Sequence, residues 1–352
     1  MKLSQDNQDL IKNFGAIPID KLSETPDNPA FSNGIVASHR DFDKFFKALK
    51  NKEKCAILSG LNASGTLHLA HKAVFDLNLF FQKKYNIPVY IPISDDESYV
   101  ADKVKTQEEA LKNSKKLAKE LIAYGFDPKK TFFIIDQIYT NIYNLAIKLS
   151  KKVNYSEIKA TYGYKPVDNI GLHFYPAIQS AHVMFPQEKF KIPNVLVPIG
   201  PDEDAHLRIS RDIAQRMGYK KPAVLHTNFL PGIDNTKMST SRPNTAIFLS
   251  DNEATIRKKI SKAFSGGRET LEEHKKLGGN PDIDIACIYL KTLFLDKDKY
   301  QEIEDKYKKG ELLSGEVKKM FADEAVKFIK QFQKNLKSVS DSVVDKSILK
   351  NE

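Results

Sequence analysis

Residues 54–71 read KCAILSGLNASGTLHLAH, and this stretch decides the fold. It opens with a short apolar run typical of a buried strand, and helical periodicity then runs from Leu67 to Tyr85. Small residues between the two predict a loop at the junction of strand and helix. In open α/β sheets ligands bind at such a junction, because the N-terminus of the helix offers free N–H groups to phosphate.

The alternation of strand and helix continues along the chain. Further strands are predicted at residues 88–94 (PVYIPIS), 131–136 (TFFIID), 194–200 (NVLVPIG) and 223–226 (AVLH), with helices at 104–124 and 204–217 and a mostly helical stretch at 139–183. Strands that alternate with helices indicate crossover connections and a parallel sheet. Residues 1–50 read as polar and irregular up to an amphipathic helix at 41–49, and strand signals stop after residue 251. The predicted fold class is therefore α/β, with an all-helical C-terminal part.

The composition limits the functions open to the chain. Its 352 residues carry 55 Lys and Arg against 45 Asp and Glu, and the formal net charge of +10 is a weak indication of a polyanionic partner. The two cysteines stand far apart, which argues against a structural zinc site or a disulfide framework and favours a cytoplasmic location. No apolar run approaches the ~20 residues that cross a membrane, and the N-terminal residues lack the apolar stretch of a secretory signal.

Two short motifs carry most of the chemical information. His68 and His71 lie three residues apart, so they share one face of the predicted helix and can bond to phosphate oxygens. The second motif, TKMSTS at residues 236–241, follows the last predicted strand and places Lys237 among small hydroxyl residues, where a loop can swing its charge onto a polyphosphate. Each motif alone is also compatible with an ordinary polar loop, but the pair in this order is specific.

The pair resembles the HIGH and KMSKS signatures of class I aminoacyl-tRNA synthetases. Further segments are similar to tryptophanyl-tRNA synthetases of the archaeal and eukaryotic type: SDDE (94–97), YPAIQ (175–179), VPIGPDEDAHLRISRD (197–212), RPNTAIFLSD (242–251) and AFSGGR (263–268). The resemblance covers about residues 10–335. It implies that the chain joins L-tryptophan to ATP, giving tryptophanyl-adenylate and pyrophosphate, and then transfers the amino acid to the 3′ end of tRNA(Trp).

The resemblance also implies a domain organisation. A Rossmann-like parallel sheet would form a catalytic domain at residues 51–250, with a helical insertion at about 101–185 that makes the dimer contact and receives the acceptor arm. Residues 1–50 would pack on this core, and residues 251–335 would be the helical anticodon-binding domain. Residues 336–352 would form a C-terminal helix that packs back on the catalytic domain. The expected assembly is a cytoplasmic homodimer spanned by tRNA, with no role for a membrane.

The positive charge is concentrated in the expected insertion. Residues 101–165 hold 13 Lys and Arg against 7 Asp and Glu, whereas residues 251–352 hold 21 against 19. Phosphates supply most of the affinity of proteins for nucleic acids. The insertion is therefore predicted to make the stronger electrostatic contact with tRNA, and a merely solvated lysine face is the alternative.

The family motifs, matched residue by residue, imply an ATP site and its catalytic groups. The implied catalytic residues are His68, His71, Lys237 and Ser239, which would stabilise the phosphates as the pentavalent centre forms. The implied ATP-binding residues are Ser59, Gly60, Ser64, Gly65, His68, His71, Gly200, Asp202, Lys237, Met238 and Ser239. Mg²⁺ would arrive with ATP, so we expect no dedicated metal site on the protein.

The amino-acid pocket departs from the family pattern at the end that holds the indole. The implied tryptophan-binding residues are Ile57, Leu58, Glu97, Tyr175, Gln179, His182 and Glu203. Glu97 and Glu203 suit the α-ammonium group, and Gln179 can bond to either end of the zwitterion. Eukaryotic members read the indole N–H with a Tyr and a Gln, but here those places hold Ile57 or Leu58 and Pro92. Our hypothesis is that Tyr175, His182 or Glu97 accepts the indole N–H, because a pocket that satisfies a buried donor discriminates better than an apolar one.

Three other functions are compatible with parts of the sequence. Tyrosyl-tRNA synthetases share the fold and both signatures, but they lack the RPNTAIFLSD and AFSGGR segments. A small-molecule nucleotidyltransferase of the HxGH type would not need the helical C-terminal part. A non-enzymatic tRNA-binding or signalling paralogue should have lost His71 or Lys237, and both are present.

Overall fold

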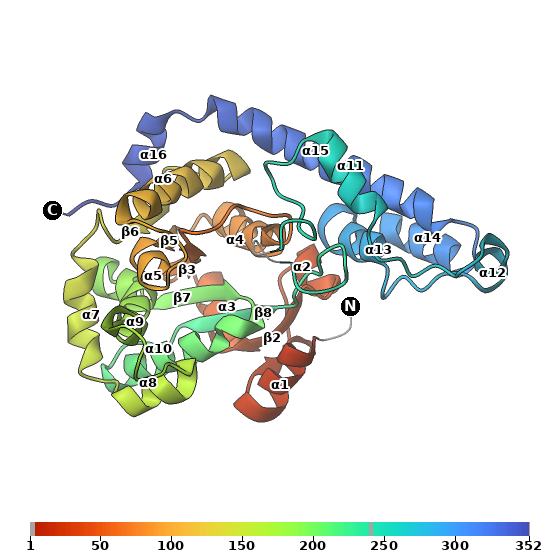
Figure 1. Ribbon diagram of the computed structural model, residues 1–352. Coiled ribbons are helices and arrows are strands. Elements are labelled where there is room, and N and C mark those ends of the chain that lie inside the picture. The colour runs from red at the N-terminus through yellow and green to blue at the C-terminus, as the bar shows by residue number, and fades with distance from the viewer. Residues whose placement is uncertain (1–3, 239–241, 352) are drawn as a thin grey trace.

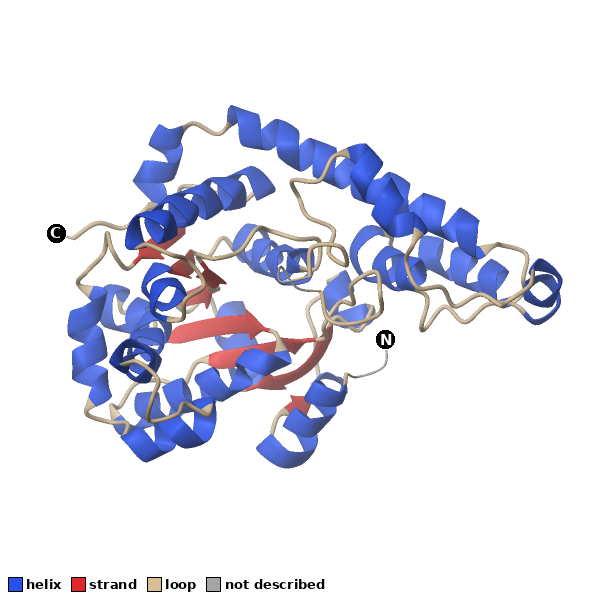
Figure 2. Ribbon diagram, viewed as in Figure 1, coloured by secondary structure: helices blue, strands red, loops and turns tan. Residues whose placement is uncertain are grey.

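A sheet with helices packed on both faces forms the centre of the molecule (Figures 1 and 2). The computed structural model describes residues 4–238 and 242–351. Within these residues the strands are β1 (Ile17–Pro18), β2 (Val36–Arg40), β3 (Cys55–Leu58), β4 (Leu61–Asn62), β5 (Val89–Ser94), β6 (Thr131–Ile135), β7 (Asn194–Ile199) and β8 (Ala223–Thr227). Their order is β1-β2-β8-β7-β3-β5-β4, and β6 pairs with β5. The pairs among β3 to β8 are parallel, whereas β1 and β2 join antiparallel, so the predicted parallel sheet is confirmed.

The helices fall into two groups along the chain. Those of the α/β body are α1 (Gln5–Phe14), η1 (Ile19–Lys21), α2 (Pro29–Ser32), α3 (Phe42–Lys50), α4 (His71–Tyr85), α5 (Asp95–Val100), α6 (Gln107–Tyr124), α7 (Ile142–Ser150), α8 (Tyr155–Tyr162), α9 (Ile170–Phe190), η2 (Pro201–Glu203) and α10 (Asp204–Arg216). The C-terminal part consists of α11 (Glu253–Ser261), α12 (Leu271–Leu277), α13 (Ile285–Tyr289), η3 (Leu290–Phe294), α14 (Lys297–Lys308), α15 (Ser314–Ser338) and α16 (Asp341–Ser347). Within the described residues, β8 is the last strand and helices follow residue 251, as the sequence predicted.

Two apolar cores lie on opposite faces of the sheet, and β3 contributes to both. Ala56 and Leu58 pack in the core that includes Tyr175 of α9, whereas Cys55 and Ile57 pack in the core that includes Phe75 of α4. Successive side chains of a strand point to opposite faces, so this division follows directly from the alternation along β3. Leu58 therefore shares a face with α9, and Ile57 does not.

Helix α9 places three predicted site residues on one of its faces. Tyr175, Gln179 and His182 are spaced by four and then three residues, which brings them to neighbouring turns on one side of the helix. The helix starts at a side-chain cap, because Asn169 Oδ1 accepts the amide N–H of Leu172 at 3.1 Å. This helix therefore presents a column of polar groups toward the carboxyl edge of the sheet.

The C-terminal helices return to the α/β body. In Figure 1 the long helix α15, in blue, crosses the top of the molecule and leads to α16 beside α6. The segment after α15 is fixed by two hydrogen bonds: the Leu349 amide donates to the carbonyl of Phe133 (2.9 Å), and Ser347 Oγ donates to the carbonyl of Pro128 (3.0 Å). Residues at the end of the chain thus contact the segment that contains β6.

The N-terminal residues are more regular than the sequence indicated. The expectation of an irregular segment before residue 41 was wrong, because β2 is a strand of the central sheet that pairs antiparallel with β8. Its polar residues Ser38 and His39 concealed it, since both are buried. Ser38 Oγ lies 2.8 Å from Nδ1 of His226 on β8, so the polar side chain finds its partner inside the sheet.

The segment expected to be a helical insertion contains part of the sheet. Residues 101–185 include β6, which pairs in parallel along the whole length of β5. The strand predicted at residues 131–136 is thereby confirmed, and an entirely helical insertion is excluded. Among the described residues, no helix is both long enough and apolar enough to cross a membrane.

Candidate active site

A cavity of about 250 Å³ opens at the carboxyl edge of the sheet, between β3, β5 and β7 and helices α4 and α9. Nine of the predicted site residues line it: Leu58, Ser59, Gly60, His71, Tyr175, Gln179, His182, Gly200 and Glu203. Sequence reasoning missed other lining residues, among them Asn62, Val74, Phe75, Ser94, Val197 and Leu207. Most of the missed residues lie on the strands and helices that hold the motifs, so only the fold could assign them to the cavity.

Other predicted residues lie outside the cavity wall. Seven of them are described by the structure but are not among the residues that line the cavity: Ser64, Gly65, His68, Glu97, Asp202, Lys237 and Met238. Ser239 falls outside the described residues. Ile57 faces the opposite core and is fully buried there. The choice that the sequence left between Ile57 and Leu58 is therefore resolved in favour of Leu58 as the cavity residue.

The two motif histidines stack at the start of α4. Their ring centroids are 3.8 Å apart, and the His68 amide N–H lies 3.0 Å from Nδ1 of His71. The same Nδ1 also lies 3.1 Å from the carbonyl oxygen of His68, so one backbone contact suits an acceptor at Nδ1 and the other suits a donor. Burial, followed by the neighbouring His71, lowers the pKa of His68 to about 2, and burial lowers the pKa of His71 to about 4. Both rings are therefore neutral at physiological pH and offer N–H groups rather than positive charges.

Lys237 points to an acidic partner at the cavity rim. Its Nζ forms an ion pair with Asp202 Oδ2 at 2.6 Å and lies 4.0 Å above the ring of Phe229. Both members of the pair are about half exposed, so the pair is screened by water and readily broken. Arg242 Nη2 donates to the carbonyl of Lys237 at 2.6 Å, which fixes the backbone at this point. The lysine is thus held next to the cavity by a partner that it can exchange.

Met238, the next residue, is anchored to the helical C-terminal part. Its side chain is buried, and the hydroxyl of Tyr289 on α13 lies 3.8 Å from its sulfur. The same hydroxyl donates to the carbonyl of Pro231 at 2.8 Å. The KMSTS motif is therefore connected at its start to the helices that follow the catalytic body.

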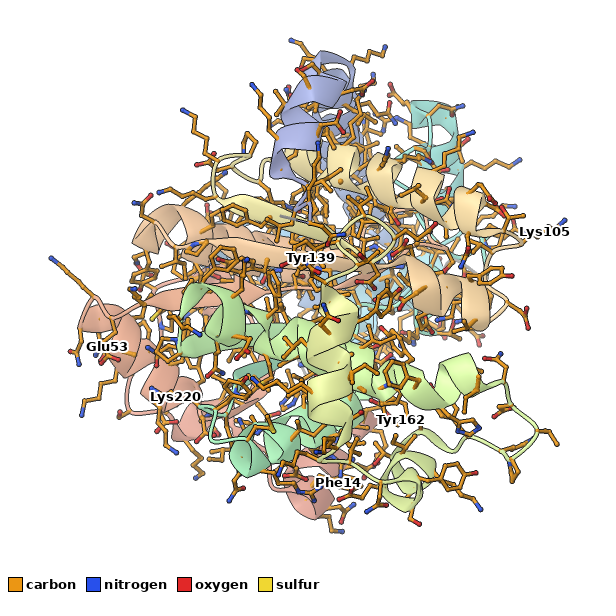
Figure 3. The ribbon with its side chains drawn as sticks, turned by 90° about the vertical axis from the view of Figure 1, so that its left-hand side faces the viewer. Phe14, Glu53, Lys105, Tyr139, Tyr162 and Lys220 are labelled. Carbon is orange, nitrogen blue, oxygen red and sulfur yellow. The ribbon has the colours of Figure 1, made fainter. Side chains whose placement is uncertain are left out.

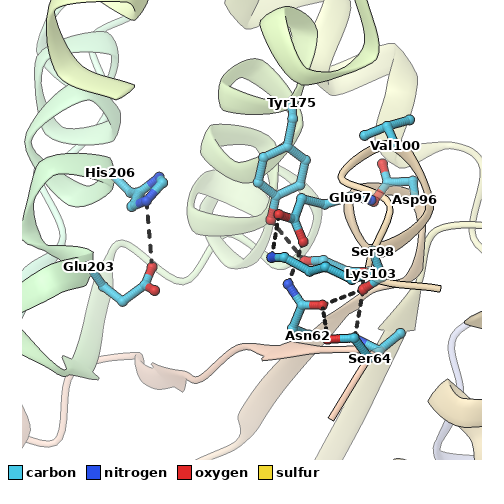
Figure 4. Close-up of polar contacts among 12 residues, drawn as sticks. Asn62, Ser64, Asp96, Glu97, Ser98, Val100, Lys103, Tyr175, Glu203 and His206 are labelled. Carbon is cyan, nitrogen blue, oxygen red and sulfur yellow. Dashed lines mark hydrogen bonds and ion pairs between the residues drawn. The ribbon is translucent and has the colours of Figure 1, made fainter. Parts of the chain in front are cut away.

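Acidic groups stand on both sides of the cavity opening, as Figure 4 shows. On one side, Asn62 Nδ2 donates to the carboxylate of Glu97, which also pairs with Lys103 Nζ at 2.7 Å. On the other side, Glu203 lies 3.9 Å from Nε2 of His206. Its side chain is about half exposed, but the crowding of protein atoms around it, followed by repulsion from Asp202, raises the pKa of Glu203 to about 7. Among the described residues, the nearest basic group that contacts Glu203 is the His206 ring at 3.9 Å, so the carboxylate can receive a closer partner from a ligand.

The cavity wall also contains apolar residues, among them Leu58, Pro92 and Val197. Ser94 Oγ and the Tyr175 hydroxyl lie 2.9 Å apart and bond to each other. His182 bonds through Nε2 to Asp136 Oδ1 at 2.8 Å, an interaction that sequence reasoning missed. Asp136 could have been noticed as the final, polar residue of the strand predicted at residues 131–136.

The glycines of the implied ATP site differ in how much room they leave. A Cβ added to Gly60 would meet no other atom within 4 Å, so its absence leaves open space for a ligand. A Cβ on Gly200 would lie 2.7 Å from Asp202 Oδ1 and 3.1 Å from the ring of Phe229. Asp202 and Phe229 therefore leave little room for a side chain at residue 200, independently of any bound nucleotide.

Three carboxylates that could share a metal ion lie behind the cavity. Ligand atoms of Asp95, Asp96 and Asp136 are all within 4.8 Å of one another. Asp95 accepts the backbone N–H groups of Asp136 (2.8 Å) and Gln137 (3.2 Å), and Asp96 Oδ1 accepts the N–H of Glu97 (2.7 Å). Protein donors bond to both oxygens of Asp95, to Asp96 Oδ1 and to Asp136 Oδ1, whereas Asp136 Oδ2 is buried without a partner among the described residues.

The fold and the two motifs define a class I tRNA synthetase. The family model described as tRNA synthetases class I (W and Y) matches residues 50–330. The tryptophan–tRNA ligase of Methanocaldococcus jannaschii is 39% identical, and the alignment covers 96% of this chain and 94% of that protein. The chain belongs to the tryptophan–tRNA ligase family.

Other relatives and solved structures agree with this assignment. The cytoplasmic tryptophan–tRNA ligase of Homo sapiens is 36% identical, over 96% of this chain and 76% of that protein. The solved tryptophanyl-tRNA synthetase of Giardia lamblia has a TM-score of 0.89 at 30% identity, with 98% of this chain and 96% of that chain covered. The resemblance drawn from the sequence and its Rossmann-like fold are confirmed. The tyrosyl alternative is not favoured, since these relatives are named for tryptophan.

Proposed function

We propose that the enzyme activates L-tryptophan with ATP and charges tRNA(Trp), and that the cavity described above holds the amino acid beside ATP. The observation that carries this proposal is the polarity of the cavity. Its wall combines polar groups, such as those of Gln179, Glu203 and His71, with the carbon surfaces of Leu58, Pro92 and Val197. An amino acid with a large apolar side chain fits such a lining, because its charged groups can meet polar residues while its ring is buried against carbon.

The proposed chemistry needs positioning and charge stabilisation rather than covalent catalysis. A carboxylate oxygen of tryptophan attacks the α-phosphorus of ATP, and the bond from that phosphorus to the bridging oxygen breaks, which releases pyrophosphate. A terminal ribose hydroxyl of tRNA then attacks the activated carbonyl carbon, and AMP leaves with the bonding electrons. Most of the acceleration is expected to come from fixed geometry and preorganised donors.

His71 and Lys237 are proposed to stabilise the phosphates in different ways. His71 would donate a ring N–H to a phosphate oxygen as a neutral group. Lys237 would exchange Asp202 for the β- and γ-phosphates, whose charge exceeds that of one carboxylate. Mg²⁺ that arrives with ATP supplies further charge neutralisation. His68 would act by positioning the ring of His71, whose Nδ1 lies beside the backbone N–H and carbonyl of His68.

The α-ammonium group of tryptophan is proposed to bind between Glu203 and Glu97. Glu203 has no close cationic partner, and an ammonium group would favour its ionised form. Glu97 is already paired with Lys103, so its role would be the weaker of the two. The amide of Gln179 can donate to the carboxylate of the substrate or accept from its ammonium group.

Contact with tRNA is proposed to involve the lysines of the segment around α6 to α8. Lys105, Lys112, Lys115 and Lys159 are exposed, and Figure 3 shows Lys105 at the edge of the molecule. Exposed cations without a buried role can release counterions from nucleic acid on binding. The finer assignments, namely the acceptor arm on these helices and the anticodon on α11 to α15, belong to this proposal.

A homodimer is proposed, with the contact near the start of α9. Two apolar side chains are strongly exposed there: Val167 (88%) and Ile170 (83%). Exposed apolar groups close together in the chain favour burial against another protein surface, and a second copy of the chain is the partner that the family suggests. A cytoplasmic location is proposed on the same grounds as tRNA charging.

Amino-acid-dependent ATP–pyrophosphate exchange tests the proposed function directly. Tryptophan should support exchange, and tyrosine at equal concentration should support at least about 100-fold less, since discrimination by buried hydrogen bonds reaches this size. Exchange with neither amino acid would refute the enzymatic proposal. Exchange with tyrosine alone would show that the enzyme is a tyrosyl-tRNA synthetase instead.

A further inference from the structure

We infer that His182 reads the indole N–H of tryptophan, through an Nδ1 lone pair that Asp136 keeps free of a proton. The inference rests on the proposed function, because it concerns the same cavity and the same substrate. It assigns a specificity-determining role to His182 and a positioning role to Asp136.

An indole ring in this cavity needs an acceptor for its nitrogen. Leu58 and Pro92 occupy two positions of the wall, and neither side chain can accept a hydrogen bond. An indole N–H that faced only carbon would lose its bond to water without replacement, which is costly in a buried site. Ser94, Tyr175 and His182 are polar side chains of the same wall, and the last two stand on α9, the helix that shares a face of the sheet with Leu58.

Tyr175 and Ser94 bond to each other. Their hydroxyl oxygens are 2.9 Å apart, so one hydroxyl donates to the other, and each oxygen keeps at least one lone pair that can accept. Glu97, the third candidate from the sequence, does not line the cavity and is bonded to Asn62 and Lys103. We therefore favour His182, whose hydrogen bond to Asp136 uses Nε2 alone, and Tyr175→Phe tests the rival hydroxyl.

Asp136 fixes the tautomer of His182. It lies directly after β6 and is fully buried, and its Oδ1 is 2.8 Å from Nε2 of His182. An ionised carboxylate can only accept, so with Asp136 ionised Nε2 carries the ring proton and Nδ1 keeps its lone pair. Within residues 4–238 and 242–351 the hydrogen bond of the His182 ring is the one made by Nε2. The ring itself lines the cavity, so the free nitrogen is available to a ligand.

The surrounding charges support this arrangement. Burial lowers the pKa of His182 to about 4, so the ring remains neutral at physiological pH. Burial, followed by repulsion from Asp136, raises the pKa of Asp96 well above its ordinary value. Burial also raises the pKa of Asp136 well above its ordinary value, so the two neighbouring carboxyl groups hold a proton between them. We place that proton on Asp96, which leaves Asp136 ionised as the acceptor for His182.

Two substitutions separate the reading of indole from the structural bond to Asp136. His182→Gln keeps an N–H near the place of Nε2, where it can still donate to Asp136, but it has no counterpart of Nδ1. His182→Asn places an amide oxygen near Nδ1 and gives up the bond to Asp136. Tyr175→Phe removes the competing hydroxyl.

The probe is the preference for tryptophan over β-(1-benzothiophen-3-yl)-L-alanine, in which sulfur replaces the indole N–H. This preference is measured as the ratio of the two kcat/KM values in ATP–pyrophosphate exchange.

The wild-type enzyme should prefer tryptophan by about 10-fold or more, the usual effect of leaving a buried polar group unpaired. H182Q should reduce this preference to near unity, whereas H182N and Y175F should each keep it within about threefold of wild type. An undiminished preference in H182Q, or a loss confined to Y175F, would overturn the assignment. A wild-type enzyme that exchanges with tryptophan but shows no preference would do the same. A wild-type enzyme without tryptophan-dependent exchange would instead refute the proposed function.

Discussion

Asp204→Ala would remove the carboxylate that joins three elements directly beside the site. Asp204 follows Glu203 and begins α10, and its carboxylate accepts from Arg40 on β2 at 2.7 and 2.9 Å. It also accepts from Nε2 of His226 on β8 at 2.8 Å. The side chains of Asp204 and His226 are fully buried, and that of Arg40 is 10% exposed. The substitution therefore leaves a nearly buried cation without its anion.

The expected cost follows from that burial. Removing one partner of a buried ion pair costs about 3–5 kcal/mol, because the other charge stays in the interior without compensation. Native proteins are stable by only about 5–15 kcal/mol. Asp204→Ala is therefore expected to remove a large part of the free energy of unfolding and to loosen the segment that carries Glu203.

Urea unfolding followed by far-ultraviolet circular dichroism measures this cost. Asp341→Ala is the matched control, because Asp341 also pairs with a cation, Lys119, but is 86% exposed. The control should unfold at the same urea concentration as the wild type. A loss below about 1 kcal/mol in Asp204→Ala, or equal losses in both variants, would refute the reasoning from burial.

The same carboxylate predicts the direction of acid sensitivity. Burial acts to raise the pKa of Asp204, but the hydrogen bonds from His226 and Arg40 outweigh it and hold the pKa well below its ordinary value. A depressed folded-state pKa gives stability that is fully present above the unfolded pKa of about 3.9 and is lost as the pH falls through the folded value. The difference in stability between wild type and Asp204→Ala should therefore be constant at neutral pH and shrink only in strong acid.

Further predictions concern the site and the proposed dimer. Lys237→Ala should lower kcat for ATP–pyrophosphate exchange by about 100-fold while the dissociation constant for tryptophan, measured by ligand fluorescence, changes little; an equal loss in tryptophan affinity would contradict the assigned role. The kcat/KM for tryptophan should fall as the pH drops below about 7, because Glu203 then takes up a proton and loses its attraction for the ammonium group. Glu203→Gln should abolish that fall, and an unchanged profile would exclude Glu203 as its source. Val167→Asp combined with Ile170→Asp should convert the proposed dimer into a monomer in analytical ultracentrifugation, and an unaltered sedimentation coefficient would place the contact elsewhere.

Much of the fold could be predicted from apolar runs and their spacing. The strands β3, β5, β6, β7 and β8 are continuous apolar segments, so their burial on both faces is visible in the sequence. Strand β2 could not be recognised, because its buried Ser38 and His39 are polar and find their partners only in the folded sheet. Polar residues that are satisfied by distant neighbours look the same in a sequence as residues that face water.

The site could be predicted as far as the motifs extended. His71 and Gln179 lie in recognisable motifs, and both line the cavity. The choice between Ile57 and Leu58 needed the phase of β3, since loop length alone could not fix which side chain faces α9. Asn62 and Asp136 were missed because their roles are contacts to residues far along the chain, namely Glu97 and His182.

The fixed backbone at Lys237 has a kinetic consequence. The carbonyl of this residue is bonded to Arg242, and the adjacent Met238 is buried against Tyr289, so the ammonium group can change partners by rotating its own side chain. Exposed side chains change rotamer within picoseconds to nanoseconds, whereas enzymes of this kind turn over about 1–1,000 times per second. The proposed transfer of Lys237 from Asp202 to ATP would therefore be a rapid pre-equilibrium and not a slow step. Added salt weakens the exposed pair between Lys237 and Asp202, so it would change how often the ammonium group occupies each of the two positions. The rate of movement between the positions would still not limit turnover.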